Sequence, residues 1–235
     1  NWFGQSSFSS LAVVTERNAV RLPSDVPVAL AGPLGCGLAT GAGTVLRVLR
    51  PEPDSSIVVF GLGAVGMAAI MAARIAECTT IIGIDPNRRR HDLARELGAT
   101  EVTSPDEHDD LGRHLRRLTG GGADFAVEAV GTESVVRQAL SSLGSPGMCA
   151  TLGLQAGRNP ITVDQTHLLG GRTLTGVIEG DADPHRFLPE LADLWRDGRF
   201  PVEKLVRTFD FTKLDDALDA VRSGEVVKAV LTFDN

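Results

Sequence analysis

The sequence predicts an α/β fold built around a doubly wound parallel sheet, flanked on both sides by parts of a second, β-rich domain. Short β-branched segments alternate with helical segments from about residue 55 to residue 178. A Gly-x-Gly-x-x-Gly run lies between the first of these strands and the helix that follows it. The residues before 36 and after 178 do not continue the alternation, so we expect them to belong to the second domain.

Before the glycine run, the sequence predicts short strands and then a helix. We expect two strands, at residues 8–14 and 18–22, on either side of a turn. A Pro-rich linker at residues 23–27 follows, and then an apolar segment at residues 28–33 that could be helix or strand. A helix is expected at residues 38–49. Pro51 and Pro53 end that helix ahead of the next strand.

The β-α-β unit around the glycines carries the clearest functional signal. A buried strand at residues 57–60 leads directly into the glycines, and a helix and a second strand ending at Asp85 follow. Gly61 lets the chain turn tightly, Gly63 lets a diphosphate approach the main chain, and Gly66 lets the helix pack closely on the strand. The positive end of the helix then faces the phosphates. This arrangement predicts a dinucleotide site.

Asp85 favours NAD over NADP as the coenzyme. Its carboxylate would accept hydrogen bonds from the adenosine ribose hydroxyls, whereas a 2′-phosphate would meet a like charge. Arg88, Arg89 and Arg90 follow closely. Because arginine at this site can accommodate a 2′-phosphate, these three residues leave the use of NADP open.

The alternation continues after Asp85 and then changes. We expect helices at residues 87–97, 107–118 and 133–143, and strands at residues 100–103, 125–128, 147–152 and 173–178. The tail predicts helices at residues 184–197 and 215–223 and a strand at residues 226–233. The strand at 173–178 is expected at an edge of the sheet, where a second subunit could cover it.

Composition limits the class of protein further. The 235 residues suffice for one large or two small domains, and 43% of them are hydrophobic, which supports a full core. A net charge of −7 gives no basic field, so we expect no nucleic-acid partner. We find no run of about 20 apolar residues and expect no membrane contact. Three scattered cysteines and the lack of a visible secretion signal favour a reducing, cytoplasmic location.

Several segments together resemble the zinc-containing medium-chain alcohol dehydrogenases. Residues 32–41 resemble the family segment that carries a catalytic-zinc cysteine. The glycine run and three later segments follow in the family's order: residues 94–99, 168–173 and 223–233. The similarity runs nearly end to end, and it is nearest to the aryl-alcohol (benzyl-alcohol) branch through residues 3–8 and 176–181.

The resemblance implies a domain organisation and a reaction. A Rossmann domain that binds NAD would cover residues 36–178. Residues 1–35 and 179–235 would belong to a GroES-like catalytic domain. The implied reaction is the NAD-dependent, zinc-dependent oxidation of a primary alcohol, in the narrower reading an aryl alcohol, to an aldehyde by hydride transfer. The implied partners are a small-molecule alcohol or aldehyde and a second subunit paired through the sixth strand.

The resemblance also assigns roles to individual residues. Cys36 matches the third protein ligand of the catalytic zinc, and no residue of this chain is assigned to catalysis itself. The implied coenzyme contacts are Gly61, Gly63, Gly66 and Asp85; Thr40 and Val65 beside the nicotinamide; Val130, Leu152 and Leu154 in the pocket walls; Arg90 near the adenosine ribose; and Lys228 near the diphosphate.

The chain departs from the family in its zinc ligands. The other ligands and the structural zinc lobe of the family lie upstream of the segment that residues 1–35 resemble, so the chain looks N-terminally truncated. Because a catalytic zinc needs three protein ligands, we expect the chain to bind NAD but to hold zinc poorly and oxidise little alcohol. Two alternatives stay open: a zinc-free quinone or enone reductase, and a stand-alone NAD-binding module.

The remaining candidate residues are expected to be structural. Cys78 and Cys149 lie in apolar segments and are expected in the core. The histidines on charged helix faces are expected to be solvated: His91, His108 and His114. Glu179 follows the sixth strand and either tunes specificity or serves as a turn residue.

Overall fold

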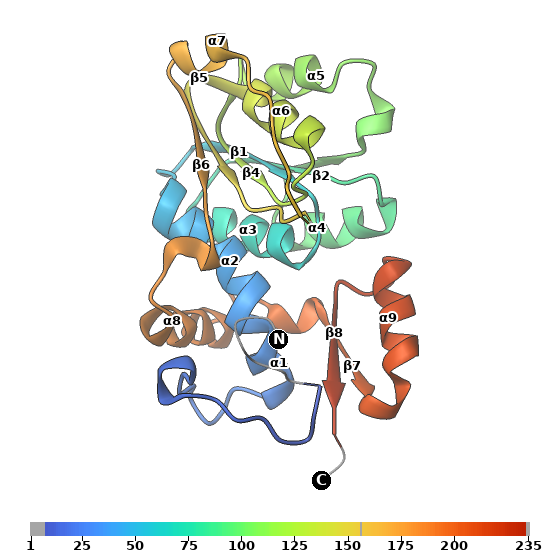
Figure 1. Cartoon of the computed structure of the whole chain (residues 1–235). Coiled ribbons are helices and arrows are strands. Elements are labelled where there is room, and N and C mark those ends of the chain that lie inside the picture. Colours follow the sequence, from blue (N-terminus) through green and yellow to red (C-terminus); the bar gives the residue numbers. More distant parts are fainter. Residues whose placement is uncertain (1–7, 156, 234–235) are drawn as a thin grey trace.

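A six-stranded parallel sheet forms the centre of the computed structural model, which describes residues 8–155 and 157–233 (Figure 1). The strand order is β3-β2-β1-β4-β5-β6, and each neighbouring pair is parallel. The strands are β1 (Ser56–Phe60), β2 (Thr80–Ile84), β3 (Glu101–Thr103), β4 (Ala123–Glu128), β5 (Leu143–Thr151) and β6 (Arg172–Gly176). The predicted doubly wound sheet is confirmed, and β6 lies at an edge as expected.

Helices cover both faces of this sheet, so its central strand is buried throughout. Ile57 and Val59 of β1 face a core with α2, α3 and α4, whereas Val58 and Phe60 face a second core with α5 and α6. Burial on both faces explains why β1 is a continuous apolar run rather than an alternating one. These helices are α2 (Ala39–Gly43), α3 (Ala64–Ile75), α4 (His91–Leu97), α5 (Leu111–Leu118) and α6 (Glu133–Ser142).

A continuous helical run precedes the sheet and is longer than the sequence predicted. It covers Val28–Leu49 and consists of α1 (Val28–Pro33), α2, and two π-helical stretches, η2 (Leu34–Leu38) and η3 (Thr44–Leu49). The run crosses α3 at Gly41, where a Cβ atom would lie 2.0 Å from the carbonyl oxygen of Val65. In the described part of the chain this is the one helix long and apolar enough to cross a membrane. However, 56% of the most apolar stretch of this helix is buried inside the fold, so its apolar side chains pack in the core.

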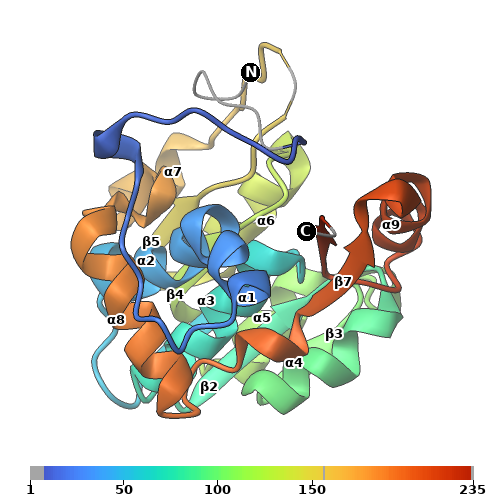
Figure 2. The same ribbon diagram turned by 90° about the horizontal axis from the view of Figure 1, so that it is seen from below.

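The C-terminal residues form a small lobe beside α1. It contains α8 (Pro184–Arg196), β7 (Val206–Asp210), α9 (Leu214–Arg222) and β8 (Lys228–Thr232), and β7 pairs with β8 in parallel. Figures 1 and 2 show α1 between α8 and the β7–β8 pair. The sequence analysis missed β7, although it predicted the other three elements. We attribute this to the sequence of β7, Val-Arg-Thr-Phe-Asp, which mixes apolar, polar and charged residues and has no continuous apolar run to indicate a buried strand.

Three other predictions are corrected by the structure. The strands predicted at 8–14 and 18–22 are wrong: the described residues there form extended chain and a 3₁₀ turn, Glu16–Asn18. Leu11 and Val13 are 85% and 95% exposed, so these apolar residues have no sheet to join in this structure. The helix predicted from residue 107 begins at Leu111, because Pro105–Glu107 forms its own 3₁₀ turn and Asp110 caps α5.

Candidate functional site

The glycine run forms the turn between β1 and α3, and each glycine meets a different constraint. Gly61 has φ +90°, a conformation that favours glycine. A Cβ atom at Gly66 would lie 1.8 Å from the carbonyl oxygen of Gly61, so only glycine allows this close packing. A Cβ atom at Gly63 would meet no heavy atom within 4 Å. The space in front of Gly63 is therefore open to a ligand at the start of α3.

Asp85 lies at the carboxyl end of β2 and is 4% exposed. Its Oδ2 accepts hydrogen bonds from the backbone N–H of Leu62 (2.7 Å) and from Arg90 Nη1 (3.0 Å), and its Oδ1 accepts one from the backbone N–H of Asn87 (2.8 Å). The carboxylate thus ties the glycine turn to the turn after β2. This arrangement places a buried negative charge beside the open space at Gly63.

A cavity of about 420 Å³ opens beside these residues. Its lining includes five of the predicted coenzyme contacts and two walls that the sequence analysis missed: Gly61, Gly63, Asp85, Arg90 and Val130, with Pro86 and Pro105 as additional apolar walls. Within the described chain, Arg90 Nε is the one buried side-chain nitrogen or oxygen without a hydrogen-bond partner. Buried donors are normally satisfied, so this N–H is a candidate partner for a ligand acceptor.

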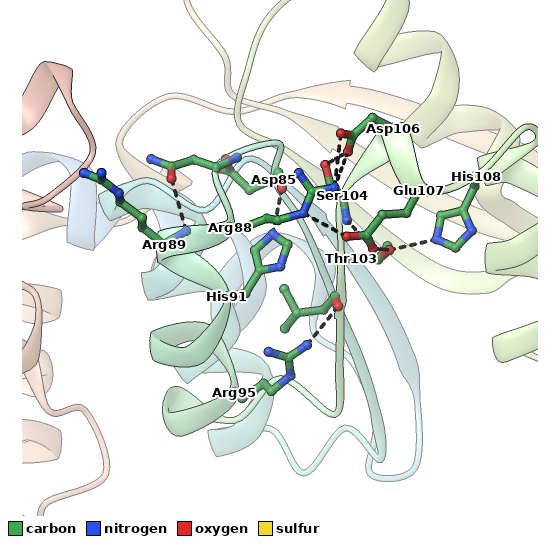
Figure 3. Close-up of polar contacts among 12 residues, drawn as sticks. Asp85, Arg88, Arg89, His91, Arg95, Thr103, Ser104, Asp106, Glu107 and His108 are labelled. Atoms are coloured by element: carbon green, nitrogen blue, oxygen red, sulfur yellow. Dashed lines mark hydrogen bonds and ion pairs between the residues drawn. The ribbon is translucent and has the colours of Figure 1, made fainter.

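Figure 3 shows that Arg88 and Arg89, two of the three arginines after Asp85, have different surroundings. Arg88 forms ion pairs with Asp106 (3.1 Å) and Glu107 (3.1 Å), whose carboxylates also accept hydrogen bonds from Ser104 and Thr103. Arg90 pairs with Asp85. The sequence placed all three arginines near the ribose, but the structure already pairs two of them with carboxylates of this chain.

His91 is buried rather than solvated, which corrects the sequence analysis. Its Nε2 lies 2.8 Å from the carbonyl oxygen of Asp85 and donates to it, so the imidazole holds the end of β2 (Figure 3). His108 and His114 are half-buried and stack with ring centroids 3.8 Å apart. Burial lowers the pKa of His114, and the neighbouring His108 lowers it further.

Cys36 lies in the π-helical stretch Leu34–Leu38 and is exposed. Partial desolvation raises the pKa of its thiol, the Glu179 carboxylate beside it adds to the rise, and the Lys228 ammonium opposes it. Glu179 begins a turn of three consecutive residues with positive φ, ending at Asp181. Such strain in residues other than glycine is often found at functional sites. No pattern in the sequence joins Cys36 to Glu179.

The described residues do not form a complete metal site. No group of three His, Cys, Asp or Glu side chains in residues 8–155 and 157–233 could hold a metal ion. One thiol and one neighbouring carboxylate supply fewer donors than the three that a catalytic zinc requires. Cys78 and Cys149 are buried in the core as predicted, and burial raises their pKa values to about 11 and about 12.

The other predicted contacts are spread over several elements of the fold. Thr40 of α2 is half-buried, and Val65 of α3 packs where α2 crosses. Lys228 shares a second cavity, of about 580 Å³, with Ala64 at the start of α3. Leu152 is half-buried after β5, whereas Leu154 is 75% exposed and does not line the cavity of Asp85.

Glu128 is a residue that the sequence analysis missed. It ends β4 and is fully buried (0% exposed), with its carboxylate accepting hydrogen bonds from two backbone N–H groups and one hydroxyl. The signal was present, because a carboxylate at the carboxyl end of a buried parallel strand is the feature that identified Asp85.

Comparisons with known proteins agree with this geometry. The zinc-binding dehydrogenase family profile matches residues 64–195. The chain is 39% identical over 233 residues to the geraniol dehydrogenase of Castellaniella defragrans, covering 99% of this chain and 62% of that protein. It is 35% identical to an alcohol dehydrogenase class-3 of Myxine glutinosa, again covering 62% of the relative. The chain thus spans about 62% of the length of these curated relatives.

Two solved structures superpose closely on the chain. An alcohol dehydrogenase zinc-binding domain protein from Burkholderia ambifaria has a TM-score of 0.95 at 42% identity, covering 99% of this chain and 63% of that one. The benzyl alcohol dehydrogenase of Acinetobacter calcoaceticus has a TM-score of 0.95 at 37% identity, covering 99% and 64%. Both similarities extend over the sheet, the helical run and the C-terminal lobe, because nearly the whole chain is covered.

Proposed function

The chain belongs to the zinc-binding dehydrogenase family of alcohol dehydrogenases, and on that premise we propose that it is the NAD-binding part of an alcohol dehydrogenase. The observation that carries this proposal is the combination of open space at Gly63 with the orphan N–H of Arg90 in one cavity. Open space beside a glycine at the start of a helix and a buried donor without a partner in the described chain are features that suit a dinucleotide site.

The residues of this chain fit the adenosine half of NAD. The backbone around Gly63 and the N-terminus of α3 would receive the diphosphate. Asp85 would accept hydrogen bonds from ribose hydroxyls while Arg90 Nε donates to the ligand. Pro86 and Val130 would supply apolar contacts to the base. When bound, NAD supplies the nicotinamide carbon that accepts hydride.

Selectivity for NAD over NADP follows from the charges around the cavity. Asp85 would repel a 2′-phosphate. Two of the three nearby arginines are already paired, Arg88 with Asp106 and Glu107 and Arg90 with Asp85 itself. A 2′-phosphate would therefore have to displace an existing ion pair to gain Arg88 or Arg90 as a partner. Arg89 has no such ion pair within the described residues, so it is the arginine that leaves the use of NADP open.

The nicotinamide end and the zinc remain proposals that rest on the family. Thr40, Val65, Leu152 and Leu154 would contact or wall the nicotinamide pocket. Lys228 would lie near the diphosphate, which its shared cavity with Ala64 supports. Cys36 would donate its thiolate to zinc in the complete enzyme. Because the described residues contain no group of three His, Cys, Asp or Glu side chains that could hold a metal ion, we expect the chain alone to hold zinc poorly.

The domain division and the pairing of subunits are also proposals. Residues 36–178 would form the coenzyme domain, and residues 1–35 and 179–235 would belong to the catalytic domain. The edge strand β6 would pair with a second subunit, which the exposed edge position supports. The benzyl alcohol dehydrogenase of Acinetobacter calcoaceticus and the geraniol dehydrogenase of Castellaniella defragrans favour a primary alcohol as substrate, with an aryl alcohol as the narrower proposal.

Isothermal titration calorimetry on the 235-residue chain tests the proposal. We expect NAD⁺ and NADH each to bind at one site and NADP⁺ to bind at least about 10-fold more weakly, a difference of about 1.4 kcal/mol. The variant Asp92→Asn is a matched control, because Asp92 is a fully exposed aspartate on α4. It should bind NAD⁺ as the wild type does. A folded chain that gives no heat with either NAD⁺ or NADH would refute the proposed function.

A further inference from the structure

Glu128 holds two loops together at the carboxyl ends of β4 and β5. Its Oε1 accepts hydrogen bonds from the backbone N–H groups of Val130 (2.7 Å) and Gly131 (2.6 Å), in the loop after β4. Its Oε2 accepts one from the hydroxyl of Thr151 (2.7 Å), the last residue of β5. The carboxylate therefore connects the β4 loop, residues 129–131, to the end of β5, where the β5 loop, residues 152–154, begins.

The main chain of Glu128 makes the same connection. Its carbonyl oxygen accepts hydrogen bonds from the N–H groups of Leu152 (2.7 Å) and Gly153 (3.2 Å). The loops touch at two glycines, since a Cβ atom at Gly153 would lie 1.9 Å from the backbone nitrogen of Gly131. Gly131 also has φ +85°, which favours glycine. This close approach lets a single side chain span both loops.

A buried carboxylate at this place is costly unless it is fully hydrogen-bonded. Glu128 meets that condition with three donors at 2.6–2.7 Å, the short distances of charge-assisted hydrogen bonds. A leucine could fill the same volume but would leave the two N–H groups of Val130 and Gly131 unpaired. The hydrogen bonds of this fully buried side chain thus hold the β4 loop against the end of β5.

Each of the two loops carries one of the proposed walls of the coenzyme site. Val130 lines the cavity that contains Asp85 and Arg90. Leu152 follows directly after Thr151 on the other loop, and it is one of the proposed walls of the nicotinamide pocket. A change in the separation of the loops would therefore alter the second wall relative to the first.

We propose that Glu128 is a positioning residue that fixes the β5 loop against the β4 loop. It thereby sets the distance between the two proposed walls that receive the nicotinamide half of the coenzyme. This inference rests on the proposed function. Glu128 does not itself line the cavity, and it acts through Thr151 and the backbone of the two loops. Its link to β5 is separable from its links to β4, because different carboxylate oxygens make them.

The test compares NADH with ADP-ribose, which lacks the nicotinamide, in variants of the 235-residue chain. Thr151→Val removes the hydroxyl that reaches Glu128 and keeps the side-chain volume. We expect it to weaken NADH binding about 10-fold, the equivalent of one charge-assisted hydrogen bond, with ADP-ribose affinity within about twofold of wild type. Thr151→Ser keeps the hydroxyl and should retain both affinities. Glu128→Gln keeps the Oε1 acceptor for the β4 loop and should retain ADP-ribose binding.

A matched control uses an exposed hydrogen bond to the β4 loop from the residue that follows the β5 loop. Gln155 is exposed, and its Nε2 donates to the carbonyl oxygen of Val130 (2.7 Å). Because a solvated neutral hydrogen bond contributes little, Gln155→Ala should change NADH affinity less than about twofold. Amide hydrogen exchange without coenzyme adds a second readout: Thr151→Val should speed exchange at Leu152 and Gly153 and leave Val130 unchanged.

The outcomes separate the two proposals. If the wild type binds NADH and ADP-ribose, but Thr151→Val keeps the wild-type ratio of their affinities, the positioning role is overturned and the proposed function stands. A parallel loss of both affinities with a lower melting temperature would likewise indicate a merely structural role and overturn it. If the wild type binds neither ligand, the proposed function fails, and the positioning role is overturned with it.

Discussion

Alanine substitutions at Gly63 and Gly66, two glycines of the β1–α3 turn, should have different effects. A Cβ atom at Gly63 would meet no heavy atom within 4 Å. Gly63 has φ −78°, which alanine adopts readily. A Cβ atom at Gly66 would lie 1.8 Å from the carbonyl oxygen of Gly61 and 3.3 Å from Val59 Cγ1. We therefore expect Gly63→Ala to affect binding and Gly66→Ala to affect folding.

The magnitudes follow from the surroundings of each Cβ atom. For Gly63→Ala, losing glycine at the N-cap of α3 costs about 0.5–1 kcal/mol, and the smaller entropy of the unfolded chain offsets about 0.4–1 kcal/mol. The free energy of unfolding should thus hardly change. For Gly66→Ala, overpacking against main chain costs about 1–3 kcal/mol. For a chain of this size, that lowers Tm by roughly 2–12 °C.

Binding should show the reverse order. A methyl group at Gly63 would occupy the space through which a diphosphate approaches the backbone. Losing one charge-assisted hydrogen bond to a phosphate costs about 1.5–3 kcal/mol, so NADH should bind about 10- to 100-fold more weakly. Thermal denaturation and NADH fluorescence titration on the same preparations measure both effects. The reasoning is refuted if Gly63→Ala binds NADH as the wild type does, or if Gly66→Ala keeps the wild-type Tm.

Three further predictions concern charge, thiols and metal. Asp85→Asn should raise NADP⁺ affinity at least about fivefold in a competition titration. The reason is that the Asp85 carboxylate and a 2′-phosphate about 4 Å away would repel each other by at least about 1 kcal/mol. An unchanged NADP⁺ affinity would contradict this electrostatic argument. At pH 8, a disulfide reagent should modify Cys36 promptly in the native chain but Cys78 and Cys149 only after unfolding. Burial holds the pKa values of those two thiols at about 11 and about 12, so less than roughly 1% of either is thiolate at that pH. Rapid modification of all three thiols in the native chain would contradict the burial of Cys78 and Cys149. The chain should retain far less than one equivalent of zinc after gel filtration and should not oxidise benzyl alcohol; zinc-dependent turnover would show that the described residues suffice.

The correct sequence predictions concern features that a short segment encodes by itself. The β1-α3-β2 unit was predicted from a β-branched run, three spaced glycines and a following acid, and the structure contains each part. Glycine at Gly61 and Gly66 is required by local backbone geometry. For that reason the turn, the open approach at Gly63 and the position of Asp85 could all be read from one stretch.

The wrong predictions concern residues whose surroundings come from elsewhere in the chain. The segments at 8–14 and 18–22 have strand-like composition, but a strand also needs a partner that the segment does not name. The charged neighbours of His91 suggested a solvated helix face, whereas the end of β2 covers it and accepts its hydrogen bond. In both cases the local pattern was read correctly, but the tertiary contact decided the outcome.

The sequence by itself determined the parallel α/β sheet, the glycine turn and the acid at the end of β2, because strand periodicity and glycine conformation are local properties. Only the tertiary structure decided that Arg88 is paired with Asp106 and Glu107, that Glu179 lies beside Cys36, and that Glu128 spans two loops. These contacts join residues from different strands and helices. Their geometry depends on how the sheet and helices pack, which residue spacing along one segment does not specify.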